Sequence, residues 1–261
     1  MPLRKLEPSF RERPWGTRNL EPWFPNVRAK AGPFPIGEVW FETPEVPLLV
    51  KFLFAKENLS VQVHPDDKYA RFHHSCAGKT EMWHVLKAEP GAKIAAGFRE
   101  PVTSEQARAG ALDGTIMGML EWFDAQPGDT FFIPAGTVHA IGAGLTICEI
   151  QQQSDITYRF FDYGRGRELH LDSALAVSHL GQHDARRAVK VECDYFVTEP
   201  LAVEGALTLP ASSAPILLIA VEGEGKIDGQ LIRAGEVWHI ADSEAVELNG
   251  NLRLLRTSVG A

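Results

Sequence analysis

The segment from Leu59 to Pro65, LSVQVHP, carries side chains that could bind a metal ion. In a β-strand, successive side chains point to opposite faces, so the apolar residues would face one side while Gln62 and His64 project together from the other. Pro65 would end the strand directly after them. An amide and an imidazole on one face make up half of a metal site.

Two later segments offer the other half, a carboxylate and a second imidazole. Residues 79–83, KTEMW, contain Glu81, and residues 133–142, IPAGTVHAIG, contain His139. Two neutral imidazoles, a carboxylate and an amide oxygen around a divalent cation leave a net positive site with room for water or other oxygen ligands. This donor set suits zinc, and manganese, iron or cobalt as well. We therefore expect a metal site formed by Gln62, His64, Glu81 and His139, with Zn²⁺ as the first choice.

The elements that must position these residues are predicted to be mostly strands. Short stretches rich in Val, Phe, Trp and Leu recur between Pro, Gly and Asp residues. Thr103 and Gln106 form a capping box before a short helix that Asp113-Gly114 ends, and a second helix is expected over 172–180. Residues 1–35 show no sustained period and are expected to be irregular. The expected strands are 37–43, 47–54, 59–65, 81–87, 92–98, 130–134 and 145–151.

Composition limits the classes of protein to which this site could belong. The 261 residues are 44% hydrophobic and 23% charged, as in soluble globular proteins with one large or two small cores. A net charge of −8 provides no basic surface for nucleic acid or an anionic membrane. Three cysteines without CxxC spacing argue against disulfides and cysteine zinc sites, which favours a cytoplasmic protein. The N-terminal residues shown contain no apolar run typical of a leader, and the longest apolar run, 216–221, is too short to span a bilayer, so neither export nor membrane anchoring is expected.

Residues 128–139, GDTFFIPAGTVH, resemble the second motif of the cupins, which are small jelly-roll barrels that hold a metal. Ala143 stands where that motif ends in Asn. The first cupin motif differs here, because Glu81 lies farther from His64 than usual. This departure resembles type I phosphomannose isomerases, in which QVHPDD, GKTEMW, PAGTVHAIGAG and EIQQxSDxTYR occur in this order. The corresponding residues here are 62–67, 78–83, 134–144 and 149–159.

The resemblance implies an all-β fold of two cupin jelly-roll barrels with a few short helices. The metal-binding domain would cover 1–185, and a smaller, degenerate cupin domain would cover 186–261. Residues 223–248 resemble a weakened second motif, with Ala241 in place of the proline and Val246 in place of the metal histidine. One metal ion per chain is therefore expected.

The resemblance also implies an aldose–ketose isomerase that interconverts mannose 6-phosphate and fructose 6-phosphate through a cis-enediol. The implied substrate is a small sugar phosphate, and the oligomeric state is not predicted. In the family, an acidic residue and an arginine of the fourth motif face the sugar, and here these are Glu149 and Arg159. A lysine near the substrate corresponds to Lys79. The permanent charge of Arg159 suits an oxyanion, whereas Glu149 could accept a proton; the identity of the base stays open.

Other interpretations compete with this one. The chain could be a non-catalytic, metal-containing, sugar-binding cupin, or an isomerase of another free or phosphorylated aldose. Arg159 and Glu149 could form a structural ion pair, and Lys79 could be a solvated loop cation. Trp15 could cover a barrel mouth, although packing is the simpler expectation. Arg165 and Arg167 could bind the phosphate group. The pairs Asp66-Asp67 and His73-His74 are expected to lie in loops.

Overall fold

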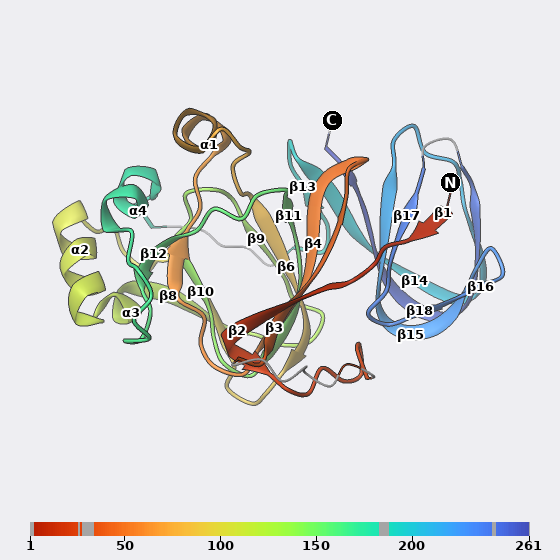
Figure 1. Ribbon diagram of the computed structural model, residues 1–261, viewed down its shortest axis with the longest axis horizontal. Helices are drawn as coiled ribbons and strands as arrows, with labels where there is room; N and C mark the ends of the chain where they lie inside the picture. Colours follow the sequence, from red (N-terminus) through yellow and green to blue (C-terminus); the bar gives the residue numbers. More distant parts are fainter. Residues whose placement is uncertain (1–2, 26, 28–33, 183–187, 242–243, 261) are drawn as a thin grey trace. The chain divides into compact units, whose positions relative to one another are not determined.

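The computed structural model describes residues 3–25, 27, 34–182, 188–241 and 244–260 (Figure 1). Strands dominate these residues and the helices are few and short, so the predicted all-β class is confirmed. Three sheets carry the strands, and their strand orders run from edge to edge without closing. The pair of barrels therefore stays a prediction.

Contacts divide the chain into two compact units, residues 1–52 together with 189–261, and residues 53–188. The break after residue 188 lies close to the expected boundary at residue 185, which itself falls outside the described residues. The first 52 residues group with the C-terminal residues instead of with the second unit. The division into domains 1–185 and 186–261 remains a prediction.

The unit of residues 53–188 contains the predicted site. One sheet has the order β12-β5-β10-β7-β8, and in another sheet β6 lies between β11 and β9. Its elements are β5 (Val61–Val63), α1 (Asp67–His74), β6 (Glu81–Ala88), β7 (Lys93–Phe98), α2 (Ser104–Asp113), α3 (Ile116–Met119), β8 (Leu120–Asp124), β9 (Thr130–Ile133), β10 (His139–Ile141), β11 (Leu145–Gln152), β12 (Tyr158–Phe161) and α4 (Leu171–Val177).

Helices α2, α3 and α4 cover one face of the five-stranded sheet, at the left of Figure 1. Ala107, Ile116 and Ala174 of these helices are buried in one cluster with Val61 and Val63 of β5. Burial of these apolar side chains stabilises the sheet and fixes which face of β5 points inward. Because side chains alternate along a strand, the residues between the two valines face the other way, as predicted for Gln62.

The unit of residues 1–52 and 189–261 consists of strands. A seven-stranded sheet has the order β1-β17-β15-β18-β14-β13, with β16 paired to β15, and β2, β3 and β4 follow one another in a second sheet. After Phe52, β4 continues into the other unit. The strands are β1 (Leu3–Lys5), β2 (Ser9–Thr17), β3 (Ile36–Thr43), β4 (Val46–Ala55), β13 (Val191–Glu192), β14 (Phe196–Leu209), β15 (Ile216–Ile227), β16 (Gln230–Arg233), β17 (Val237–Ile240) and β18 (Val246–Val259).

Two local predictions were wrong. The segment 1–35 is not irregular throughout, because it contains β1 and β2; residues 1–2, 26 and 28–33 of it lie outside the described residues. The register of β2 against β3 shifts after Arg11 and again after Glu12, and these irregularities hide the alternation of a strand. Residues 67–74 form helix α1, to which Asp66 supplies a side-chain cap on the N–H of Tyr69, instead of a loop.

Three other features bear on the expectations from the sequence. Trp15 is only 2% exposed, which fits the packing role. The cysteines Cys76, Cys148 and Cys193 are all free. Among the described residues, no helix has both the length and the apolar character needed to cross a membrane.

Candidate metal centre

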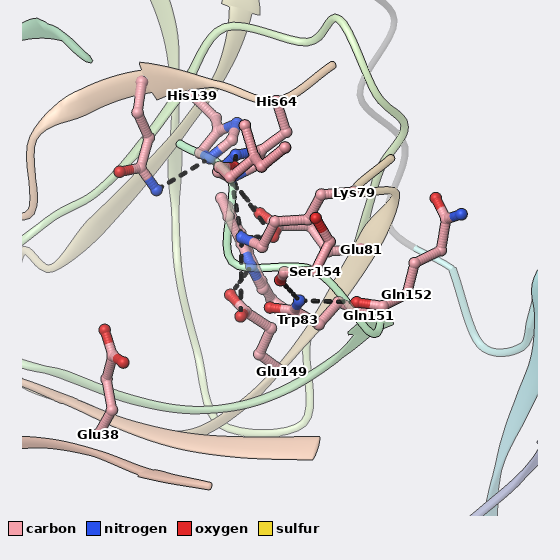
Figure 2. A network of polar contacts seen from close by, with 12 residues as sticks. Glu38, His64, Lys79, Glu81, Trp83, His139, Glu149, Gln151, Gln152 and Ser154 are labelled. Atoms are coloured by element: carbon pink, nitrogen blue, oxygen red, sulfur yellow. Dashed lines mark hydrogen bonds and ion pairs between the residues drawn. The ribbon is translucent and has the colours of Figure 1, made fainter. Parts of the chain in front are cut away.

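Three buried side chains from separate strands converge in the unit of residues 53–188 (Figure 2). Glu81 is the first residue of β6 and His139 the first of β10, while His64 directly follows β5. Strands β5 and β10 are antiparallel neighbours, with His139 opposite Gln62. The ligand atoms of His64, Glu81 and His139 all lie within 4.8 Å of one another.

Each histidine faces its own oxygen of the Glu81 carboxylate. The Nε2 atom of His64 lies 3.6 Å from Oε2, and the Nε2 atom of His139 lies 3.4 Å from Oε1. The other ring nitrogen, Nδ1, lies 2.7 Å from the carbonyl oxygen of Ile156 in His64 and 2.9 Å from that of Thr137 in His139. A carbonyl oxygen only accepts, so Nδ1 carries the proton and Nε2 keeps its lone pair toward the carboxylate.

The electrostatics of this group suit a bound cation. Burial lowers the pKa of His139 to about 3, and the nearby Lys79 lowers it as well, so this imidazole is neutral near pH 7. The side chain of Glu81 has no solvent exposure. A buried carboxylate needs a cation close by. Two neutral imidazole nitrogens and a carboxylate are typical ligands of zinc and related divalent metals, so the residues present fit a metal ion.

Gln62 lies beside this group with its amide nitrogen turned inward. Its Nε2 atom is 3.3 Å from Nε2 of His139, and its Oε1 atom accepts a hydrogen bond of 3.1 Å from the Ser60 hydroxyl. A rotation of the amide by half a turn exchanges the two atoms and directs the oxygen at His139. The structure therefore brings Gln62 to the expected place, and this rotation would supply the fourth donor.

Lys79 and Glu149 adjoin the group of His64, Glu81 and His139. Lys79 lies two residues before Glu81, and its Nζ atom is 2.5 Å from Oε2 of Glu81 and 2.8 Å from Nε2 of His64. The lysine is only 4% exposed, so it is not a solvated loop cation. Glu149 on β11 has one carboxylate oxygen 4.0 Å from the same Nζ atom.

Trp83 was not predicted from the sequence, and it contacts both Glu149 and His139. The indole Nε1 donates a hydrogen bond of 3.0 Å to Oε2 of Glu149, and the ring meets that of His139 edge to face at 5.2 Å. Trp83 is opposite Glu149 in the β6–β11 pair. The signal was present in part, since Glu81 and Trp83 are two residues apart on β6 and share a face.

Arg159 lies on β12, opposite Gln62 of β5. Directly opposed residues of an antiparallel pair place their side chains on the same face of the sheet. The side chain of Arg159 therefore leaves the sheet on the side of Gln62. Its backbone is fixed by His170, whose N–H donates to the Arg159 carbonyl and whose Nδ1 accepts from the Arg159 N–H.

A polar clamp fixes the segment that carries Lys79 and Glu81. The Oδ1 atom of Asp67 accepts hydrogen bonds from the N–H of Gly78 at 2.8 Å and from the amide of Gln152 at 2.7 Å. The amide oxygen of Gln152 accepts from the N–H of Thr80 at 2.9 Å. A Cβ atom on Gly78 would lie 2.5 Å from the backbone of residues 66 and 67, so only glycine allows this approach.

The loop before His139 needs glycine for a similar reason. Gly136 has a φ of +85°, and a Cβ atom there would lie 2.5 Å from the ring of His179. Its N–H donates to the carbonyl oxygen of His64 at 2.8 Å. This hydrogen bond joins the two histidine segments directly.

The two arginines considered as phosphate ligands are engaged elsewhere. Arg167 donates from Nε to Asp162 at 2.7 Å, and Arg165 donates to the carbonyl oxygen of Asn58 at 2.7 Å and contacts the same Asp162 at 3.3 Å. Both guanidinium groups therefore serve to hold this loop.

The chain is similar to known isomerases in sequence and in fold. Residues 36–90 match the family model of the phosphomannose isomerase type I catalytic domain. GmuF of Bacillus subtilis, named a probable mannose-6-phosphate isomerase, is 33% identical over 85% of this chain and 86% of its own length. Mannose-6-phosphate isomerase ManA of the same organism is 34% identical over 76% of this chain and 72% of its own. A crystal structure of mannose 6-phosphate isomerase from B. subtilis superposes with a TM-score of 0.87 at 24% identity, covering 98% of this chain and 99% of that one.

Proposed function

Because this chain belongs to the type I mannose-6-phosphate isomerase family, we propose that it interconverts mannose 6-phosphate and fructose 6-phosphate with one bound divalent metal ion. The observation that carries this proposal is the buried group of His64, Glu81 and His139. Lys79 and Glu149 adjoin it, and Arg159 leaves its strand on the same side as Gln62. A binding site alone would not need ionisable groups beside the metal ligands.

We assign the metal to His64, Glu81, His139 and the amide oxygen of Gln62, with Zn²⁺ as the expected ion. Two imidazoles, one carboxylate and one amide oxygen match the nitrogen and oxygen donors that zinc accepts. When bound, the ion supplies a positive charge for the sugar oxygens on which negative charge develops during the reaction. The C-terminal segment 186–261 is proposed as a degenerate cupin domain without metal, since Val246, in the place of the histidine, is buried.

We assign the proton transfer between C2 and C1 to Glu149 and Lys79. The indole of Trp83 holds one oxygen of the Glu149 carboxylate, which leaves the other oxygen directed toward Lys79. A carboxylate fixed in this way can accept the proton from one carbon of the open-chain sugar and return it to the next. Arg159 cannot lose its charge near neutral pH and would stabilise the oxyanion of the enediol.

The decisive experiment combines a substrate assay with proton exchange. Purified protein is assayed with mannose 6-phosphate, glucose 6-phosphate and free mannose, and the metal content of the same sample is measured. Mannose 6-phosphate in D₂O should become fructose 6-phosphate and incorporate deuterium at the carbon that receives the proton. Tight binding of the sugar without isomerisation or exchange would instead identify a sugar-binding cupin, and turnover of another aldose alone would change the substrate.

A further inference from the structure

Lys79 makes contacts that its proposed part in proton transfer does not require. Its Nζ atom lies 2.5 Å from Oε2 of Glu81 and 2.8 Å from Nε2 of His64, which are two of the proposed ligand atoms. In Figure 2 the dashed contacts of this amine run to these residues and also toward Glu149. Three of its neighbours thus belong to the metal site or the proton-transfer site.

The lone pair of His64 can serve only one cation at a time. Its Nδ1 is occupied by the carbonyl oxygen of Ile156 at 2.7 Å, so Nε2 has the single lone pair of a neutral imidazole. That lone pair accepts an N–H from the ammonium group of Lys79. A metal ion would need the same lone pair. The ammonium group and the metal are therefore mutually exclusive at this atom.

Charge strengthens this exclusion. Glu81 is fully buried, and the ammonium group of Lys79 balances its carboxylate. A divalent cation between His64 and Glu81 would take over that balance and repel the ammonium group at short range. A second carboxylate is close by, since Oε1 of Glu149 lies 4.0 Å from Nζ. Rotations within the four-carbon stem of the lysine are sufficient to cover that difference.

We propose that Lys79 is an exchangeable counter-cation of the metal site: its ammonium group leaves His64 and Glu81 when a metal ion binds, and Glu149 receives it. This inference rests on the proposed metal site. It adds that metal loading itself brings Lys79 and Glu149 together as a pair. The metal affinity of the protein is accordingly set by the release of an internal cation as well as by the ligands.

The test is a double-mutant cycle on metal affinity. Chelator-stripped full-length protein is titrated with Zn²⁺ in competition with a chelating dye, for the wild type, Lys79→Met, Glu149→Gln and the double variant. Lys79→Met should bind Zn²⁺ about tenfold more tightly, because no ammonium group has to leave. Glu149→Gln should weaken binding about tenfold in the wild-type background and by less than about threefold in the Lys79→Met background.

The matched control is Lys87→Met, which removes an exposed lysine from the same strand, β6, and should leave the Zn²⁺ affinity unchanged. An unchanged or weaker affinity in Lys79→Met would overturn the inference. So would an equal effect of Glu149→Gln in the two backgrounds, because simple attraction of the metal by Glu149 predicts that result.

A second measurement covers the case in which stripped Lys79→Met does not fold. The variant is then prepared with Zn²⁺, and the release of the metal into excess chelator is followed. Release slower than in the wild type supports the exchange, and release at an equal or faster rate contradicts it. If the wild type binds Zn²⁺ and isomerises mannose 6-phosphate without this coupling, only the exchange fails; if the wild type binds no metal, the proposed metal site fails.

Discussion

The orientation and the tautomer of the two histidines in the site depend on the hydrogen bond that Nδ1 of each ring makes. In each ring, Nδ1 donates to a backbone carbonyl oxygen, that of Ile156 for His64 and that of Thr137 for His139. These hydrogen bonds fix both the orientation of the ring and its tautomer. The ligand nitrogen is thus prepared by the backbone before any metal binds, and a substitution at either histidine removes a preformed donor.

His139→Ala should lower the metal content to below about a tenth of an ion per chain and reduce isomerase activity in parallel, because the remaining donors bind too weakly. Elemental analysis and an activity assay on one preparation check this expectation. His84→Ala is the control, since His84 lies on β6 but contacts the hydroxyl of Thr130. Full metal occupancy in His139→Ala would show that another residue is the ligand.

Arg159→Ala distinguishes catalysis from structure at a single position. If the guanidinium group stabilises charge that appears only in the enediol-like transition state, kcat should fall about 100-fold or more, with a smaller change in KM and normal metal content. A purely structural arginine predicts a lower Tm with near-normal kcat in the folded fraction. Measurements of kcat, metal content and Tm on one sample separate these outcomes.

At the scale of elements, the connection between β5 and β6 holds two of the proposed ligands in place relative to each other. It begins at His64, contains α1 and ends at Glu81, and Asp67 ties its two ends together through Gly78 and Gln152. A ligand that follows a three-residue strand has little support from that strand alone. The clamp therefore supplies the precision that the metal site needs.

Asp67→Ala should lower the free energy of unfolding by about 1–3 kcal/mol, because the buried N–H of Gly78 and the amide of Gln152 lose their acceptor. Zn²⁺ affinity should fall about tenfold as the segment carrying Glu81 loosens. Asp67→Asn keeps an acceptor oxygen and should recover most of both losses. Denaturant unfolding and zinc titration provide the measurements, and equal effects of the two substitutions would contradict a clamp role.

Strands and helices were predictable from the sequence where a single local signal, such as composition or a capping box, determined the structure. Short stretches rich in Val, Phe, Trp and Leu between Pro, Gly and Asp residues located the strands β3 to β7, and the capping box of Thr103 located α2. The sequence did not predict β2, because the register of this strand shifts twice against β3. Its pairing with β3, and not an alternation of its own side chains, defines the strand. α1 was missed because it is short and rich in histidine and charge, and is fixed by Asp66 and tertiary contacts more than by helix propensity.

The meeting of His64 and His139 was predictable for a different reason, namely that the motif spacing matches a known family. Spacing alone does not reveal which side chains meet in space, and it did not indicate that Trp83 holds Glu149 or that Lys79 bonds to His64. Those contacts depend on pairing β6 with β11 and on burial, which are properties of the folded chain.

At the scale of the whole molecule, stability at low pH depends on buried histidines far from the site in sequence. His239 on β17 is 4% exposed, and within the described part of the chain neither ring nitrogen has a hydrogen-bond partner. Burial lowers its pKa below the usual 6.5. The unfolded chain therefore binds a proton there at a higher pH than the folded chain, so stability is lost as the pH falls below about 6.5.

His239→Leu should raise the free energy of unfolding by about 1 kcal/mol at pH 7, because a buried polar ring without partners is removed. The gain should be larger at pH 5, where the wild type pays an additional penalty for keeping this histidine neutral. Urea unfolding at both pH values tests this. A gain that shrinks at pH 5 would contradict the assigned direction of the pKa shift.

Of the three proposed ligands, His139 lies far along the chain from His64 and Glu81, and β5 and β10 belong to one sheet while β6 belongs to another. Contacts between distant segments form late in folding, because closing long loops costs entropy before it gains contacts. A complete set of donors therefore exists only after both sheets have formed and met. We therefore expect the proposed metal ion to bind only after these strands have paired during refolding, so that metal uptake would report a late step of folding.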